Sequence, residues 1–368
     1  MSDSALHSAD HVNTYDAWVN DPRGVISTGF AEMDALLRKG GVAPATLVLL
    51  GGRTGTRKTT TGMNILANML DQDVPCGLIG LDGGLANNYL GRLFSIRANE
   101  PMEQVEATWN NEKKQQFKEE YRQWAKNLSI YNGPPRPSPT NLSEWLLECE
   151  LPSHPAERPQ VVFIDYVSLL HRRPFSDQQR IPQLIEELQV WTTQHEVVSY
   201  VVHQVGRMDE GVALRYHGDT PMSLAGLKYG GEEIADIVLA TYRPAKELVG
   251  NMTFEMAKRF KGEKFTFEDY EQAQARVERY WDYTFLQLLK NRPGVHLNEK
   301  GIPLRQQDEG MKMHVDMSIL ETEDEPWAAA VDPGDTARAF GGEADGKTEI
   351  AQTHDEVQAQ VATLSDPA

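Results

Sequence analysis

The chain has 368 residues, of which 40% are hydrophobic, so it can bury the core of one large domain or two small ones. No run of about 18 apolar residues occurs and the N-terminus is polar, so we expect neither export nor membrane insertion, and a cytoplasmic location. Its two cysteines, Cys76 and Cys149, have no metal-ligand spacing around them, which argues against a disulfide framework or a zinc site.

The net charge of −18 is unevenly distributed along the chain. Residues 321–368 hold 12 acidic and two basic residues, a net −10, in a segment rich in Gly, Ala and Pro. This composition predicts a disordered acidic tail, and a solubilising role is favoured over a partner-binding one. The first residues are also polar. We therefore expect an N-terminal arm or linker over residues 1–24, a folded domain over 25–305 and an acidic tail over 306–368.

Apolar runs and helical periodicities alternate through the central part of the chain. Strands are expected at 46–52, 76–82, 128–133, 161–170, 197–204, 234–242 and 283–290. Amphipathic helices are expected at 60–70, 111–128 and 181–195. Continuous apolar strands that alternate with helices predict an α/β fold with a mainly parallel central sheet flanked by helices on both faces.

The stretch GGRTGTRKTT at 51–60 is close to the phosphate-loop (Walker A) pattern G-x-x-x-x-G-K-[ST]. It lies between an expected strand and an expected helix, so backbone N–H groups and a helix N-terminus would meet a phosphate. Lys58 would contact the β- and γ-phosphates of ATP, and the Thr59 hydroxyl would bind Mg²⁺. Arg57 stands where the pattern has its last glycine, and the alternative is a chance turn. The expected nucleotide-binding residues of this loop are Gly52, Gly55, Arg57, Lys58, Thr59 and Thr60.

Three further polar residues stand at or near the ends of expected strands. Asp165 ends the apolar run VVFID, where an ionised carboxylate is costly without a cation, so we expect a second Mg²⁺ ligand there. Asp82 is placed to orient or deprotonate water, although an aspartate that caps a helix or a turn is the alternative. Gln204 could sense the γ-phosphate through a hydrogen bond, although a glutamine at a strand end means little alone.

The order of these pieces resembles the RecA-like ATPase domain of DnaB-type replicative helicases, many of them encoded by phages. The resemblance covers roughly residues 24–304 and rests on five segments besides the phosphate loop. These are STGFAEMDALLRKGG, GLDGGLANNYLGRL, IDYVSLL, VVHQVGR and LLKNRPG. The resemblance implies a P-loop ATPase core and an ATP-dependent DNA helicase or translocase that encircles single-stranded DNA as a homo-oligomeric ring, a hexamer, in (phage) DNA replication, with other replication proteins as possible partners.

The resemblance also implies roles for individual residues. Asp82 takes the place of the catalytic glutamate, Gln204 is the glutamine linked to the γ-phosphate, and Arg243 lies near the adenine. Lys290 and Arg292 match the pair that the family inserts into the neighbouring subunit's site as an arginine finger, whereas without the family they are simply a basic strand end. Residues in two loops at 206–221 and 225–232 would contact single-stranded DNA. These are Arg207, Arg215 and Lys228.

The chain departs from the family pattern at Arg57, at Asp82, at Ala45 in a usual glycine position, and in the unassigned insertion at 243–283. No N-terminal domain is expected, so primase binding through one is not supported. Two alternatives to the helicase remain open. One is a RecA- or RadA-like recombination ATPase that forms filaments, and the other is a catalytically weakened loader or scaffold that binds nucleotide or DNA.

Overall fold

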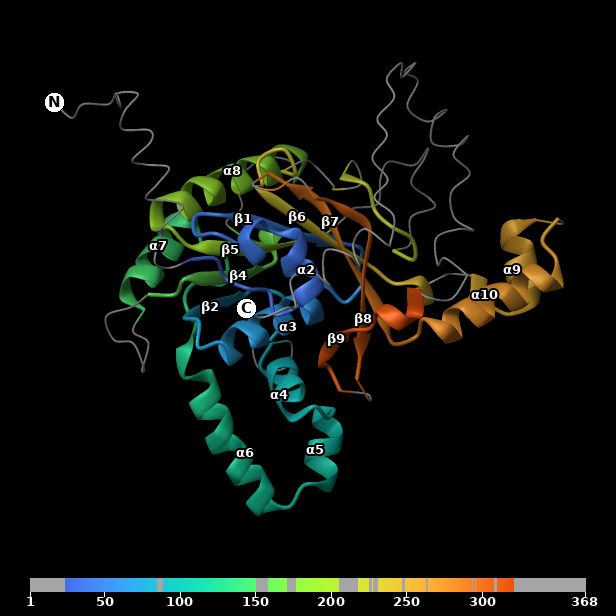
Figure 1. Cartoon of the computed structure of the whole chain (residues 1–368), viewed down its shortest axis with the longest axis horizontal. Helices are drawn as coiled ribbons and strands as arrows, with labels where there is room; N and C mark the ends of the chain where they lie inside the picture. The colour runs from blue at the N-terminus through green and yellow to red at the C-terminus, as the bar shows by residue number, and fades with distance from the viewer. Residues whose placement is uncertain are drawn as a thin grey trace, which may run out of the picture.

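The computed structural model describes residues 24–84, 89–149, 158–170, 177–204, 218–224, 227, 231–246, 249–262, 264–292, 294, 296–307 and 310–320. A nine-stranded sheet runs through this part of the chain (Figure 1). Its spatial order is β3-β2-β4-β5-β1-β6-β7-β8-β9. The strands are β1 (Leu47–Gly52), β2 (Cys76–Gly80), β3 (Leu128–Ile130), β4 (Val161–Asp165), β5 (Val198–Gln204), β6 (Ile237–Tyr242), β7 (Tyr283–Asn291), β8 (Asn298–Gln306) and β9 (Met313–Val315).

The first six strands of the chain are parallel where they pair, and the last three extend the sheet with antiparallel pairs. Strands β1 and β4 to β6 are almost wholly buried because both faces of the sheet are covered. The prediction of an α/β fold with a mainly parallel sheet is therefore confirmed. Parallel strands also place their carboxyl ends at one edge, which brings the polar residues that follow β1, β2, β4 and β5 together.

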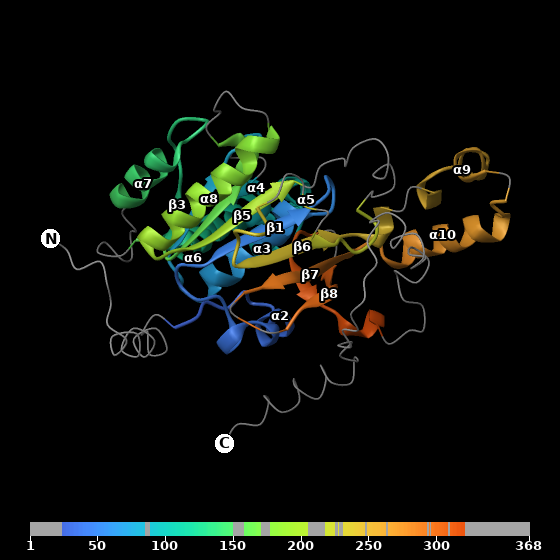
Figure 2. The same ribbon diagram turned by 90° about the horizontal axis from the view of Figure 1, so that it is seen from above.

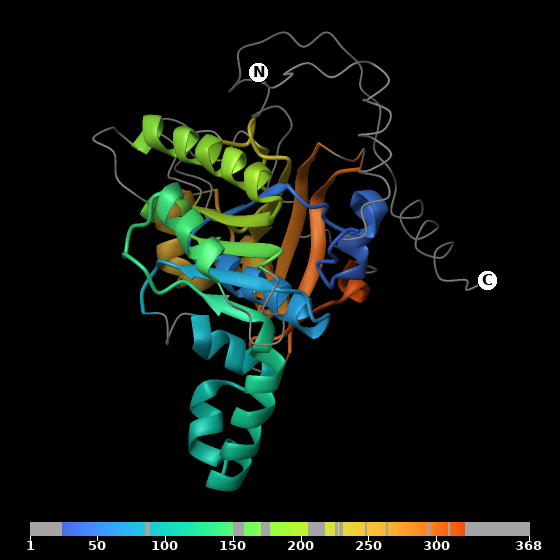
Figure 3. The same ribbon diagram turned by 90° about the vertical axis from the view of Figure 1, so that its left-hand side faces the viewer.

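Helices cover the two faces in separate layers, which Figures 2 and 3 show from two sides with α8 and α2 on opposite faces of the sheet. One layer contains α2 (Ala31–Leu36), α3 (Lys58–Asp71) and α4 (Gly91–Ala98), and it shares a core with Val48, Leu50 and Phe163. The other contains α7 (Pro139–Glu148) and α8 (Asp177–His195), and it packs on Leu47, Leu49 and Val162. Adjacent residues of one strand therefore serve opposite cores.

Two helical arms extend from this core. Helices α5 (Met102–Thr108) and α6 (Asn111–Trp124) project from the side of α4, as Figures 1 and 3 show. Helices α9 (Phe254–Lys261) and α10 (Phe267–Arg279) form the second arm and occupy the insertion that the sequence left unassigned. Both α9 and α10 are preceded by N-cap threonines, Thr253 and Thr266, whose hydroxyls accept a hydrogen bond from a backbone N–H of the first turn.

Several predicted boundaries are wrong. The apolar run 161–170 is not one strand, because β4 ends at Asp165 and Val167 and Leu170 pack with α8 from the 3₁₀ turn η4 (Val167–Leu169). Strands β2 and β3 end earlier than predicted, and β6 begins later. Beyond residue 305 the last residue of β8, strand β9 and the 3₁₀ turn η9 (Met317–Leu320) follow. Residues 321–368 lie outside the described part.

Candidate nucleotide-binding site

The phosphate loop connects β1 to α3 at the carboxyl edge of the sheet. Gly52 has φ +149°, and a Cβ built on it would lie 2.7 Å from the hydroxyl oxygens of both Thr56 and Thr241. Those two hydroxyls are 2.9 Å apart and hydrogen-bonded to each other. Only glycine fits between them, so the first glycine of the pattern is fixed by packing as well as by backbone conformation. Gly55, at the tip of the loop, has φ +79°.

Arg57 precedes α3 with a left-handed backbone, φ 62° and ψ 28°. The glycine-like conformation of the phosphate loop is thus retained with a side chain that disfavours it. The Arg57 guanidinium donates through Nη1 to the carbonyl oxygen of Asp282 at 2.9 Å and through Nη2 to that of Trp281 at 3.5 Å. Burial, with a contribution from Arg243, lowers its pKa to about 10. Arg57, the residue that departs from the phosphate-loop pattern, therefore connects the loop to the turn that precedes β7.

Lys58, the first residue of α3, is held within the loop. Its Nζ donates to the carbonyl oxygen of Arg53 at 2.8 Å. Burial lowers the pKa of Lys58 to about 8, and Asp165 opposes this shift. The ammonium therefore lies in a place where water stabilises it poorly and a bound anion would stabilise it well.

Thr59 and Asp165 meet at the end of β4. The Thr59 hydroxyl donates to Oδ2 of Asp165 at 2.7 Å, and Asp165 is only 3% exposed. Burial raises the pKa of Asp165, while the Thr59 hydrogen bond lowers it. Two oxygen ligands of one Mg²⁺ at about 2.1 Å stand about 3 Å apart when they are adjacent, so this pair fits a shared octahedral ion. Since the described residues contain no cluster of three or more His, Cys, Asp or Glu, phosphate and water oxygens would complete the shell.

Asp82 is exposed and lies two residues beyond β2 rather than at its end. Tyr89 fixes its distance from Asp165, because the Tyr89 hydroxyl accepts from the Asp82 backbone N–H at 3.1 Å and donates to the Asp165 carbonyl at 3.0 Å. The two carboxylates are close enough for Asp82 to raise the pKa of Asp165. Gln204 ends β5 opposite Gly52 and donates from Nε2 to the Thr54 hydroxyl at 2.6 Å. The predicted residues Lys58, Thr59, Asp82, Asp165 and Gln204 therefore converge on one loop.

Several residues that sequence reasoning missed also converge here. Lys246, in the 3₁₀ turn η7 (Pro244–Lys246), donates to the carbonyl oxygen of Thr54 at the loop's tip. Arg92 donates from Nη1 to the Thr60 hydroxyl at 2.8 Å. Burial, Arg53 and Arg243 lower the pKa of Lys246. The loop is therefore surrounded by more positive charge than Lys58 alone provides, as a polyphosphate site requires. No sequence pattern marks Lys246 or Arg92 as part of the site. Only the fold, which brings both residues next to the phosphate loop, identifies them.

Lys290 and Arg292 lie at the opposite edge of the sheet. Lys290 pairs with Val238, near the start of β6, whereas the phosphate loop lies beside the end of β6. Strand β6 has six residues, and at about 3.3 Å for each residue it separates the two edges by roughly 20 Å. Arg292 makes an ion pair with Asp236 at 3.2 Å, and Lys290 donates to the Glu232 and Glu233 carbonyls at 2.6 and 2.9 Å. Neither side chain reaches the phosphate loop of its own chain.

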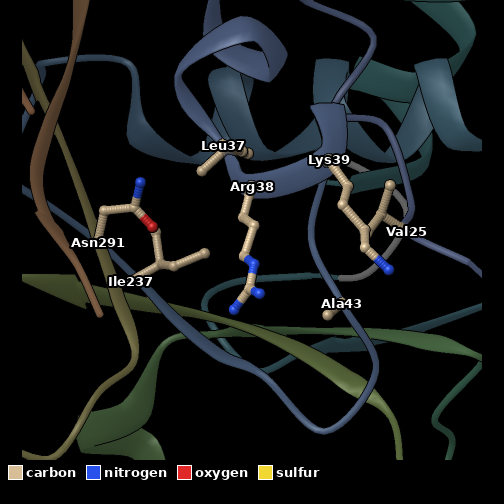
Figure 4. Close-up of a pocket in the computed structure, with 8 residues that line it drawn as sticks. Val25, Leu37, Arg38, Lys39, Ala43, Ile237 and Asn291 are labelled. Atoms are coloured by element: carbon tan, nitrogen blue, oxygen red, sulfur yellow. The ribbon is translucent and has the colours of Figure 1, made fainter. Parts of the chain in front are cut away.

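Figure 4 shows a pocket at this second edge, lined by Arg38, Lys39, Ile237 and Asn291 among others. Its volume is about 20 Å³. A single water needs about 10–15 Å³ of such space, so the pocket is far too small for a nucleotide. Among the described residues, the phosphate loop, Thr59, Asp165 and Gln204 meet at the carboxyl edge instead. The predicted DNA contacts Arg207, Arg215 and Lys228 lie outside the described residues.

This strand order, with a phosphate loop after the central strand β1 and an acidic residue ending β4, defines a RecA-like α/β domain. A model of the DnaB-like helicase C terminal domain family matches residues 25–277, and the chain belongs to this family. The predicted resemblance is thereby confirmed, and membership supports a helicase of the replicative class. No curated protein sequence matches the chain. None of the described helices is long and apolar enough to cross a membrane.

Many solved structures are similar to the chain, and two of them are an ATPase domain and a replicative helicase. The ATPase domain of G40P has a TM-score of 0.61 and 18% identity, over 85% of this chain and 99% of that one. A DnaB-like replicative helicase, studied with its interactions with primase, has a TM-score of 0.59 and 18% identity, over 85% of this chain and 67% of that one. At this identity the likeness establishes the fold.

Proposed function

We propose that this protein is an ATP-hydrolysing DNA helicase or translocase that moves on single-stranded DNA as a ring-shaped oligomer, a hexamer. The observation that carries the proposal is the arrangement of two half-sites on opposite edges of one sheet. The phosphate loop with Asp165 is at the carboxyl edge, and Lys290 with Arg292 is at the other. A complete site then needs two copies of the chain, side by side.

Each residue has a role that follows from its surroundings. Lys58 would exchange its hydrogen bond to the Arg53 carbonyl for phosphate oxygens, which relieves its unfavourable burial. Mg²⁺ held by Thr59 and Asp165 would neutralise charge on the β- and γ-phosphates. Asp82, exposed and fixed beside Asp165, would orient the attacking water. Gln204, on the neighbouring strand, would respond to the γ-phosphate through Thr54.

The guanidinium of Arg292 would act on the neighbour's nucleotide. A planar guanidinium stabilises the charge that develops on a transferred phosphoryl group, which is worth orders of magnitude in rate. The ion pair of Arg292 with Asp236 fixes the end of β7 from which it would reach out. Hydrolysis in one subunit would thus depend on the position of the next, as a motor that moves along DNA needs.

Strand displacement on a labelled forked duplex tests the proposal. The parent should unwind the duplex with ATP and Mg²⁺, and Lys58→Ala should lower DNA-stimulated hydrolysis by roughly 100-fold or more. Lys118→Ala, an exposed lysine on α6, is the matched control and should behave like the parent. Hydrolysis with filaments on DNA in place of rings would favour a recombination ATPase. Neither hydrolysis nor unwinding would favour a nucleotide- or DNA-binding scaffold.

Mixing two inactive variants tests the shared site. Lys58→Ala keeps Arg292, and Arg292→Ala keeps Lys58, so a mixed oligomer contains some complete sites if Arg292 acts on its neighbour. Activity should therefore reappear on mixing. Mixed oligomers that form and stay inactive would refute the role of Arg292 in the neighbouring site.

A further inference from the structure

An exposed indole lies beside the phosphate loop, on the turn between α10 and β7. Trp281 is 57% exposed, whereas Tyr280 before it is 2% and Tyr283 after it 7% exposed. No aromatic ring among the described residues stacks on Trp281. Single exposed apolar residues are common, so exposure alone says little. Its location and its rigid support are what distinguish this one.

The turn is held rigidly by the rings on either side of Trp281. Tyr280 and Tyr283 belong to a buried cluster with Tyr242 and Phe285. The ring of Phe285 lies 5.0 Å from that of Tyr242 and 6.0 Å from that of Tyr280, centroid to centroid. Because the flanking residues are fixed in this way, the Trp281 backbone loses little further freedom when its ring binds a partner.

Two arginines connect this turn to the phosphate loop. Arg57, which directly precedes Lys58, donates to the Asp282 carbonyl, and Arg243, which directly follows β6, donates from Nη2 to the Trp281 carbonyl at 2.8 Å. The backbone of Trp281 is thus one arginine side chain away from the backbone of Arg57. A nucleotide whose phosphates occupy the loop has its base at a distance of this kind. Both hydrogen bonds use backbone carbonyls, so the indole itself is left available.

The chemistry of the turn fits a nucleobase. An indole offers a large flat face for stacking, and base–aromatic stacking is worth about 1–3 kcal/mol per base in nucleic-acid sites. The guanidinium groups of Arg57 and Arg243 are planar cations that also stack on or hydrogen-bond to bases. The exposed Asp282 carboxylate is an acceptor for ribose hydroxyls or an exocyclic amine.

We propose that Trp281 is the stacking platform for the base of the nucleotide whose phosphates are held by the loop at 52–59. The proposal deepens the proposed function and rests on it, since it requires that the loop bind a nucleoside triphosphate. It assigns a role in the nucleotide site to the turn that closes the α9–α10 insertion. Stacking is tolerant of base identity, so Trp281 contributes affinity for any purine nucleotide. The polar groups around the turn, Asp282, Arg57 and Arg243, would distinguish one base from another.

Substitution at Trp281 tests this directly because Trp281→Ala removes the indole and keeps the carbonyl that Arg243 uses. Binding of Mg²⁺–ATP and of Mg²⁺–tripolyphosphate to the full chain is measured for the parent, Trp281→Ala and Trp281→Phe. Trp281→Ala should weaken ATP binding about tenfold or more and change tripolyphosphate binding less than about twofold. Trp281→Phe should recover most of the ATP affinity.

Two further variants separate the possible failures. Phe267→Ala removes another exposed aromatic, 54% exposed on α10, and should bind ATP like the parent. Lys58→Ala should lose both ligands. ATP binding that is unchanged in Trp281→Ala but lost in Lys58→Ala would overturn the stacking role alone. Equal weakening of ATP and tripolyphosphate in Trp281→Ala would also overturn it, and retention of both ligands by Lys58→Ala would instead overturn the proposed nucleotide site.

Discussion

Two opposing effects on stability meet at Arg57: its left-handed backbone is strained, and its side chain tethers the loop through a hydrogen bond to Asp282. A side chain at φ 62° costs about 1–2 kcal/mol relative to a right-handed conformation. The hydrogen bond to Asp282 offsets this, since bonds from a charged donor contribute about 1.5–3 kcal/mol and partial exposure places this one at the low end. Strain and tether are therefore nearly balanced in the parent.

Three proteins resolve the two contributions: the parent, Arg57→Ala and Arg57→Gly. The alanine variant keeps the strain and loses the tether, so we expect it to be destabilised by about 1–2 kcal/mol. The glycine variant loses both, so we expect it within about 1 kcal/mol of the parent. Glycine should therefore be more stable than alanine by about 1 kcal/mol, or roughly 2–4 °C in Tm for a domain of this size.

Urea and thermal unfolding without nucleotide provide the measurement. Both variants are compared with the parent at one pH and protein concentration, so that self-association does not differ between them. If alanine is as stable as glycine at this position, the left-handed conformation carries no cost and the strain argument is wrong. If both variants are as stable as the parent, the tether to the Trp281–Asp282 turn contributes nothing.

Three further outcomes follow from the same geometry. The pKa of Lys58 in the folded protein, about 8, lies below its usual 10.5, so between these pH values the unfolded chain binds more protons and the free energy of unfolding rises with pH. Without nucleotide, Lys58→Met should therefore be more stable than the parent at pH 7 in urea unfolding, and the difference should shrink by pH 9.5. Gly52→Ala places a methyl group 2.7 Å from two threonine hydroxyls and should abolish stabilisation by Mg²⁺–ATP in thermal shifts, while Gly84→Ala, with nothing within 4 Å, should keep it. Asp236→Ala removes the carboxylate oxygen that accepts from the Leu47 N–H at 3.0 Å and should lower the free energy of unfolding in urea by about 1–3 kcal/mol. Asp236→Asn keeps an acceptor and should lower it less.

The part of the site that the sequence predicts is the part encoded locally. The phosphate loop is recognised because a strand, its glycines and a helix are contiguous, and Asp165 because a carboxylate ends an apolar run. Gln204 is aligned with Gly52 because parallel strands β5 and β1 are in register. Tertiary contacts could not be foreseen in this way. The partner of Arg57 is Asp282, 225 residues further along the chain, and no periodicity connects them.

The missed elements divide into two kinds. Helix α10 carries a legible signal, because Tyr270, Ala273 and Val277 recur at helical spacing and are its buried residues. Strand β8 carries almost none, since its sequence NEKGIPLRQ has few apolar residues, includes Pro303 and opens with exposed charge. It becomes a strand because it pairs with β7 in antiparallel orientation, with Pro303 opposite Phe285. Pairing across the sheet, which is not local, decided this element.

Strand β7 is what relates the two edges of the sheet to each other. It begins one residue after Asp282, whose carbonyl accepts from Arg57 of the phosphate loop, and it ends at Asn291, between Lys290 and Arg292. Its centre is buried on both faces, so it transmits displacement as a rigid element more readily than a loop would. The Arg57 guanidinium donates to two backbone carbonyls of the turn, so a shift of the loop would act on the backbone that leads into β7. The arginine that departs from the phosphate-loop pattern is therefore bonded to the turn that leads into the strand, and Arg292 directly follows that strand at the opposite edge.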